Sequence, residues 1–225
     1  MIIGNGLIAN LFRENDRENV VFFASGVSNS LETDKSAFLR EENLIRKTIK
    51  ENPNKIFIYF STCSIYDSSK NGSSYVNHKL KMEQIVEELA NQFLILRVSN
   101  AVGKGGNPNL LMNYLVNAFH QEKEITVHTL ATRNLIDADD IKNITLKFIN
   151  ENSFNKIINV AYLENFSTIQ ILEILEKHFN KTAKTSLVKS GQSYLISIPE
   201  AEAYFAENKL TEKKEYLHRI IKMYY

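Results

Sequence analysis

The sequence predicts an α/β fold, a doubly wound parallel sheet trimmed at one edge, with a small C-terminal substrate-binding region. Three observations predict it. Short apolar segments alternate with segments of helical periodicity along the 225 residues. Several apolar segments carry no polar positions, which is typical of strands buried on both faces of a parallel sheet. A glycine-rich turn joins the first strand to the first helix.

The elements follow one another in a regular order. We predict strands at residues 2–3, 20–24, 55–60, 93–98 and 157–160, with short ones around 125–135 and a weak one at 186–188. We predict helices at residues 6–13, 34–50, 74–90, 109–120, 138–150 and 168–179, with two short helical patterns in the tail. Thr33-Asp34 and Ser167-Thr168 supply N-caps for two of these helices, and the last pattern is expected to dock on the core.

Composition narrows the function classes. The 27 lysines and arginines balance 26 aspartates and glutamates, so no nucleic-acid or membrane partner is expected. The single Cys63 excludes an internal disulfide and a cysteine zinc site, and the scattered histidines predict no metal centre. No signal peptide and no membrane-spanning run is apparent. We therefore expect a cytoplasmic protein with one domain over residues 1–225, whose cofactor-binding core ends near residue 103.

The turn after the first strand reads Gly4-Asn5-Gly6-Leu7-Ile8-Ala9. This is the G-x-G-x-x-A form of a dinucleotide-binding fingerprint, placed between strand and helix as its physics requires. Gly4 permits the tight turn, Gly6 lets the backbone approach a pyrophosphate, and Ala9 allows close packing of helix on sheet. A structural glycine turn is the alternative interpretation. No acidic residue follows the second strand to hold a ribose.

Tyr75 and Lys79 stand four residues apart on a predicted helix, and so on one face of it. A lysine ammonium there favours the ionised form of a phenol, whose ordinary pKa is about 10. Thr62, at the end of the preceding strand, offers a hydroxyl that can orient a substrate oxygen. The three side chains together suit proton transfer to or from a carbonyl/alcohol couple. Ser61 and Ser64 are alternates for the hydroxyl.

In order along the chain, these motifs resemble the extended short-chain dehydrogenase/reductase superfamily, the Rossmann-like branch with NAD-dependent sugar-nucleotide epimerases, dehydratases and reductases. Further segments add to the likeness. Leu96-Arg97-Val98-Ser99-Asn100-Ala101-Val102-Gly103 is similar to the family's "LRxxNxxG" segment, and the segment from Arg133 to Ile141 to its "RDFIHVDDV" segment. Asn107 to Met112 resembles the loop that touches a nucleotide-sugar diphosphate.

The resemblance implies roles for individual residues. Tyr75, Lys79 and Thr62 are the expected catalytic residues. NAD or NADP is the expected cofactor, with Lys79 on the nicotinamide ribose and further contacts from Gly4, Asn5, Gly6, Leu7, Ile8, Ala24, Ser25 and Gly26. A nucleotide-sugar is the expected substrate, contacted by Ser64, Asn100, Asn109 and Arg133. Family members also often form homodimers through helices that include the tyrosine-bearing one.

The chain departs from the family pattern in two places. It passes from the first helix directly to what resembles the family's fourth strand, so the second and third strands are absent. In the family order 3-2-1-4-5-6 this trims one edge, and a right-handed first crossover would then need the helix to change faces or the strand order to differ. The deletion also removes the ribose-binding acid, which weakens the expectation of tight NAD binding. Only twelve residues separate Thr62 from Tyr75, which predicts an open pocket.

The expected function is that of an NAD(P)-dependent epimerase, dehydratase or reductase acting on a nucleotide-activated sugar in surface-polysaccharide synthesis. The alternative is a catalytically degenerate relative that binds a nucleotide-sugar or a partner without turnover. Two further expectations concern groups outside the catalysis. Cys63 is expected to pack as a small apolar residue, and Asp137, Asp139 and Asp140 to cap a helix rather than to bind a metal.

Overall fold

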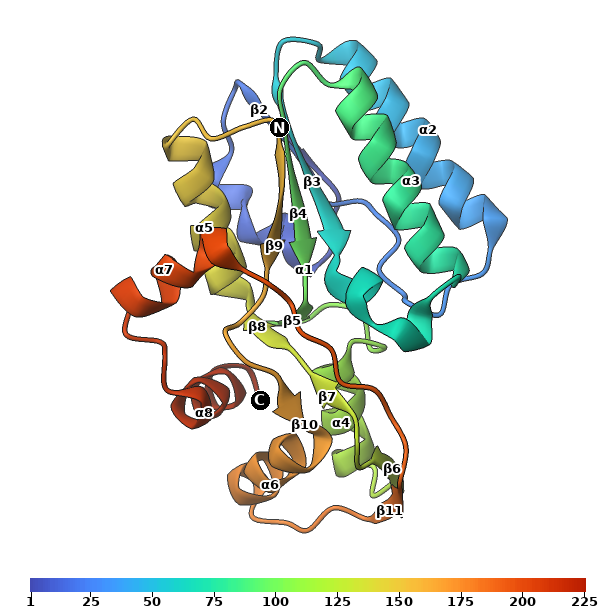
Figure 1. Cartoon of the computed structure of the whole chain (residues 1–225), viewed down its shortest axis with the longest axis vertical. Helices are drawn as coiled ribbons and strands as arrows, with labels where there is room; N and C mark the ends of the chain where they lie inside the picture. Colours follow the sequence, from blue (N-terminus) through green and yellow to red (C-terminus); the bar gives the residue numbers. More distant parts are fainter.

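The core of the molecule is a five-stranded sheet in the order β1-β2-β3-β4-β9, with every neighbouring pair parallel. The computed structural model describes residues 1–225. The five strands are β1 (Ile2–Ile3), β2 (Val20–Phe23), β3 (Ile56–Thr62), β4 (Phe93–Val98) and β9 (Lys156–Val160). The predicted parallel sheet is confirmed, and Figure 1 shows β3, β4 and β9 running in the same direction. The outermost strand on one side is β1.

Helices cover both faces of the sheet, as predicted. Helices α2 (Lys35–Glu51) and α3 (Ser74–Leu89) pack side by side on one face (Figure 1). Helices α1 (Leu7–Leu11) and α5 (Ala138–Asn150) pack against each other on the opposite face. Strand β2 serves both layers, because Val21 and Phe23 join the cluster under α2 and α3 whereas Val20 and Phe22 join the cluster on the other face. This alternation is why the strand reads as an unbroken apolar run.

The first crossover departs from the usual handedness rule. The chain steps across the sheet in one direction from β1 to β2 to β3, yet α1 lies on the face opposite to α2. The connection through α1 therefore has the opposite hand to the one through α2. A right-handed first crossover would need α1 on the other face of the sheet or a different strand order, and neither is observed. Packing explains why: Phe12, just after α1, stacks on Phe22 with ring centroids 4.4 Å apart and holds the helix where it is.

Side-chain caps fix the beginnings of the helices. The Asp34 carboxylate accepts a hydrogen bond from the Ser36 N–H at the start of α2, and Ser73 caps α3 in the same way. Asp137 caps α5, which confirms the role expected for it. Ser167 and Gln170 form a capping box at the start of α6 (Thr168–Phe179). These local signals are why the predicted helix starts lie close to the observed ones.

The C-terminal half builds a lobe beneath the carboxyl ends of the main strands (Figure 1). It contains three two-stranded sheets, which pair β5 (Asn100–Val102) with β8 (Leu135–Asp137), β6 (Ile125–His128) with β11 (Thr185–Val188), and β7 (Thr132–Arg133) with β10 (Phe166–Ser167). Its other helices are α4 (Leu111–His120) and α8 (Lys213–Tyr224), whereas α7 (Pro199–Glu207) packs beside β9 of the main sheet. Helix α8 buries Tyr216, Leu217, Ile220 and Ile221, so its predicted docking is confirmed.

Core residues of this lobe belong to the same apolar cluster as one face of the main sheet. Strands β5 and β10 were not predicted, because each is only two or three residues long and, unlike β1, neither is followed by a G-x-G-x-x-A turn. The boundary near residue 103 stays a prediction. No helix combines the length and apolar character needed to cross a membrane.

Candidate active site

A cavity of about 210 Å³ opens at the carboxyl ends of β2, β3 and β4, between the sheet and the C-terminal lobe. This edge is where open α/β sheets bind their ligands. The structure brings most of the predicted site residues together in its lining: Ile8, Ala24, Gly26, Thr62, Ser64, Tyr75, Lys79, Asn100 and Asn109. The remaining predicted residues do not line it: Gly4, Asn5, Gly6, Leu7, Ser25 and Arg133.

Tyr75 and Thr62 both line this cavity. Tyr75 is only 7% exposed, and its hydroxyl makes no hydrogen bond within the protein. The Thr62 oxygen accepts a hydrogen bond from the Ser64 N–H at 3.0 Å, which leaves the Thr62 proton free to be donated. Ser61 is not an equivalent alternate, because its hydroxyl donates to Glu83. Both free hydroxyls can therefore address one substrate oxygen.

Cys63, which follows Thr62 in the chain, is buried. Its thiol donates to the Arg97 carbonyl oxygen at 2.9 Å, and burial raises the pKa of the Cys63 thiol well above its usual range. A thiol in this state is a poor nucleophile. The expectation that Cys63 packs as a small apolar residue is confirmed.

Lys79 is 2% exposed and held from two sides. Its ammonium donates to Glu41 Oε1 at 3.2 Å and to the Phe60 carbonyl oxygen at 3.0 Å. It also lies over the Tyr59 ring, 4.4 Å from the centroid. A lysine ammonium has three N–H donors, so one remains without a protein partner beside the cavity.

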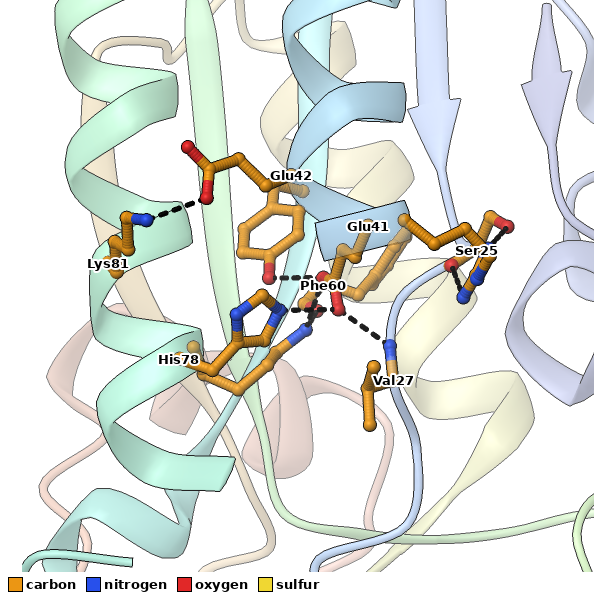
Figure 2. Close-up of polar contacts among 10 residues, drawn as sticks. Ser25, Val27, Glu41, Glu42, Phe60, His78 and Lys81 are labelled. Atoms are coloured by element: carbon orange, nitrogen blue, oxygen red, sulfur yellow. Dashed lines mark hydrogen bonds and ion pairs between the residues drawn. The ribbon is translucent and has the colours of Figure 1, made fainter. Parts of the chain in front are cut away.

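Glu41 is the group that sequence reasoning missed. Its side chain is fully buried on α2, and Figure 2 shows four contacts converging on its carboxylate. They come from the Tyr59 hydroxyl at 2.7 Å, the Val27 N–H at 2.7 Å, His78 Nε2 at 3.0 Å and Lys79. The signal was present: Glu41 lies four and eight residues before Ile45 and Ile49, on the face that α2 buries.

The electrostatic balance at Glu41 favours its charged form. Burial by itself raises the pKa of the Glu41 carboxyl, but the Lys79 charge and the hydrogen bonds from His78, Val27 and Tyr59 outweigh it. The net pKa of Glu41 is far below its ordinary value. Burial, followed by the Glu41 charge, raises the pKa of Tyr59, so Tyr59 stays a neutral donor. The site therefore contains a permanent buried ion pair.

A second buried carboxylate, Glu83, lies one turn after Lys79 on the same face of α3. Glu83 receives both Nε and Nη2 of Arg97 on β4, at 3.0 and 2.6 Å, in addition to the Ser61 hydroxyl. The hydrogen bonds to Glu83 outweigh burial and raise the pKa of Arg97. Tyr66 joins this network by accepting a hydrogen bond from Arg97 Nη1 at 3.4 Å, donates to Asn159 Oδ1 at 3.0 Å, and does not line the cavity. The strand end and the tyrosine-bearing helix are thus fixed to each other.

Gly4, Gly6 and Gly26 differ in how much space surrounds them. Gly4 has φ +127°, and a Cβ there would lie 2.5 Å from the Ala24 carbonyl oxygen, so Gly4 serves the approach of β1 to β2. A Cβ on Gly6 would meet nothing within 4 Å. This open space beside the start of α1 suits a pyrophosphate lying against the backbone. A Cβ on Gly26 would lie 2.8 Å from Glu41 Oε1 and 3.0 Å from Lys79 Nζ.

The predicted substrate contacts differ in how they are held. Asn100 lines the cavity, but its amide donates to the Asn134 carbonyl oxygen at 2.7 Å. Asn109 also lines it, and its side chain makes no hydrogen bond within the protein. Arg133 donates to the neighbouring Thr132 carbonyl oxygen and lies outside the lining. Of the four predicted substrate contacts, Ser64 and Asn109 thus line the cavity with side chains that make no hydrogen bond within the protein.

Tyr194 also lines the cavity and was not predicted. It lies between β11 and α7, on a segment fastened by Asn165, whose amide donates to the Tyr194 carbonyl oxygen. Burial raises the pKa of Tyr194. No short motif marks this position, because the residue reaches the cavity through the path of the C-terminal segment. No group of His, Cys, Asp and Glu side chains could hold a metal ion.

The sequence from residue 4 to residue 161 matches the model of the NAD dependent epimerase/dehydratase family. The chain belongs to this family. The matched region contains the glycine turn, the Thr62 strand end and the helix with Tyr75 and Lys79. No protein of curated function matches the sequence.

Solved structures of the same fold include several sugar-nucleotide enzymes. A UDP-glucuronic acid 4-epimerase from Bacillus cereus, in complex with UDP-glucuronic acid and NAD, has 19% identity and a TM-score of 0.69 over 96% of this chain and 79% of that one. A UDP-N-acetylglucosamine 4-epimerase from Methanobrevibacter ruminantium has 18% identity and a TM-score of 0.68 over 99% and 82%. A dTDP-glucose 4,6-dehydratase from Bacillus anthracis, in complex with NAD, has 16% identity and a TM-score of 0.66 over 97% and 78%.

Proposed function

We propose that the protein is an NAD-dependent enzyme that oxidises or epimerises a carbinol carbon of a nucleoside diphosphate sugar. The observation that carries the proposal is the set of free donors at one cavity. The Tyr75 hydroxyl, the Thr62 proton and one Lys79 N–H have no partner in the protein, and all three side chains line the cavity. A ligand in the cavity can accept hydrogen bonds from these donors.

The residues present suit the nicotinamide half of the cofactor. The free Lys79 N–H can hold ribose hydroxyls, and the open space at Gly6 can receive a pyrophosphate. NAD, when bound, supplies the acceptor for a hydride from the sugar carbon. Tyr75 takes the proton of the sugar hydroxyl at its phenolic oxygen, while Thr62 donates a hydrogen bond to the same sugar oxygen. Lys79 favours the charged form of Tyr75 during this transfer.

The chemistry of the lining favours reaction at one carbon. No Asp, Glu or His side chain lines the cavity. Elimination of water from a sugar needs further groups to take a carbon-bound proton and to protonate the leaving hydroxyl. Hydride transfer with return of the hydride, or net oxidation or reduction, needs only the proton transfer that Tyr75 supplies. We therefore place epimerisation and simple oxidoreduction ahead of dehydration.

Relatives support the substrate class. The B. cereus epimerase binds UDP-glucuronic acid and NAD, and the M. ruminantium enzyme binds UDP-N-acetylmuramic acid. For this chain we propose a uridine diphosphate sugar whose diphosphate reaches Asn109, and a role in surface-polysaccharide synthesis. A homodimer and a cytoplasmic location complete the proposal.

The test begins with binding. We expect the purified protein to bind NADH, followed by nicotinamide fluorescence, and to convert at least one sugar of a UDP-sugar panel. Tyr75→Phe should lower turnover by about 100-fold or more while leaving the NADH dissociation constant within about twofold. Tyr114→Phe is the matched control, because Tyr114 is an exposed tyrosine on α4 outside the cavity.

Two results would contradict the proposal. Absence of dinucleotide binding at millimolar NAD(H) would leave the alternative, a protein that binds a nucleotide-sugar or a partner without turnover. Turnover that survives Tyr75→Phe unchanged would remove Tyr75 from the proton transfer.

A further inference from the structure

The ion pair between Glu41 on α2 and Lys79 on α3 is buried, unlike a surface salt bridge. Glu41 and Lys79 are both almost fully buried, and each makes further hydrogen bonds. A neighbouring carboxylate on the same helix, Glu42, pairs with Lys81 and Arg46 near the surface. Two adjacent glutamates on one helix thus differ in burial and in partner (Figure 2).

Glu41 decides where the Lys79 ammonium points. With one N–H directed at Glu41 Oε1 and another at the Phe60 carbonyl oxygen, the tetrahedral ammonium has a single direction left for its third N–H. The Tyr59 ring beneath the ammonium closes a further side. Lys79 lines the cavity, so the third N–H is directed to the ligand side.

Glu41 also ties the catalytic helix to the loop after β2. The carboxylate receives the Val27 N–H, and Gly26 approaches the ion pair so closely that any side chain there would collide with it. Gly26 and Val27 line the same cavity as Lys79. One carboxylate therefore fixes both a wall of the cavity and the direction of Lys79.

We propose that Glu41 is a positioning residue, which holds Lys79 toward the cofactor and limits how strongly the Lys79 charge favours the ionised form of Tyr75. The inference rests on the proposed function for its meaning in catalysis. Because opposite charges offset each other at nearby sites, loss of the Glu41 charge should strengthen the effect of Lys79 on Tyr75. An ion pair electrostatically isolated from Tyr75 would have no such effect.

Other ionisable groups surround the ion pair of Glu41 and Lys79. From α3 come His78, which bonds to Glu41, and Glu83, which is committed to Arg97. From β3 comes Tyr59, which donates to Glu41. Around the cavity itself the only other ionisable side chains are those of Cys63 and Tyr194. Glu41 is thus the carboxylate in direct contact with Lys79.

The test is a titration of the Tyr75 phenolate by ultraviolet difference absorbance, each protein being compared with its own Tyr75→Phe version. In Glu41→Gln, the phenolate should appear at a pH lower by about one unit than in the wild type. Glu42→Gln is the matched control and should leave the titration unchanged. Equal titrations for folded Glu41→Gln and for the wild type would overturn the proposal.

A second variant covers the case in which Glu41→Gln does not fold. Glu41→Asp keeps the charge but is one methylene shorter, so it cannot reach both Lys79 and Val27. In Glu41→Asp we expect the Tyr75 phenolate to titrate as in the wild type and the NADH dissociation constant to rise about tenfold. An unchanged dissociation constant in this variant would contradict the positioning role.

The titration needs neither cofactor nor substrate. A failed titration therefore leaves the proposed enzyme function untouched, whereas a failure to bind NADH leaves the titration interpretable.

Discussion

The two ends of the cleft along the carboxyl edge of the sheet are built differently. Around Tyr75, the strand end of β3 and helix α3 are fixed by two buried carboxylates, Glu41 and Glu83. At the glycine turn, the sheet ends with the two-residue β1, and α1 has only five residues. No strand lies outside β1 to add a further wall.

The buried charged contacts are concentrated around α3 and the end of β3. Buried charges are costly unless they are paired, so two such networks around one cavity indicate that its geometry is worth fixing. At the glycine turn no ion pair is present, and the pair between Asp16 and the terminal ammonium is exposed and lies at the amino ends of β1 and β2, on the opposite edge of the sheet. We infer that a bound dinucleotide is held mainly from its nicotinamide half.

The largest effect is expected from removing one of the buried carboxylates. Glu83→Ala leaves Arg97 and Ser61 without their partner and should lower the free energy of unfolding by roughly 3 kcal/mol. Asp16→Ala, which removes an exposed pair at the amino edge of the sheet and serves as the reference, should cost less than about 1 kcal/mol. Urea unfolding measures both values. Similar losses for the two variants would show that the buried Glu83 network stabilises the fold no more than an exposed pair does.

Glycine substitutions sharpen the contrast within the turn itself. Gly4→Ala should lower the free energy of unfolding by roughly 2 kcal/mol, because a side chain at φ +127° meets the Ala24 carbonyl oxygen. Gly6→Ala should leave stability unchanged, since its Cβ points into open space. It should instead weaken NADH binding, measured by fluorescence, by filling the place of the pyrophosphate. A Gly6→Ala protein with wild-type affinity would show that no ligand lies there.

The smallest effect concerns pH. Although burial opposes it, contacts with Lys79 and three hydrogen-bond donors lower the pKa of Glu41 in the folded protein. A carboxyl with a lowered pKa stabilises the folded state above its unfolded pKa of about 4.3, and this stabilisation is lost as the pH falls. We expect wild type to lose at least about 1 kcal/mol more than Glu41→Gln between pH 7 and pH 3 in urea unfolding. Parallel losses would mean that Glu41 contributes nothing to acid stability.

Much of the fold could be predicted because local signals are strong. Apolar runs gave the strands, and capping residues such as Asp34 and Ser167 gave the helix starts. The hand of the first crossover could not be predicted, because it depends on the packing of Phe12 against Phe22 from a later strand.

The candidate site was predicted in part for the same reason. Tyr75, Lys79 and Thr62 form a motif with fixed spacing, and the structure brings them to one cavity. Glu41 and Tyr194 belong to no motif, since each reaches the site through the path of a distant segment. Arg133 was expected to touch the substrate by resemblance, and its side chain bonds to the backbone beside it instead.

A binding experiment separates the contributions of the two halves of the cofactor to its affinity. It compares the dissociation constants of NADH and of reduced nicotinamide mononucleotide, which lacks the adenosine half. If the cofactor is held mainly from its nicotinamide end, the two constants should agree within about tenfold, or about 1.4 kcal/mol. Binding of NADH that is tighter by about a thousandfold or more would contradict the account, because the adenosine half would then carry most of the affinity.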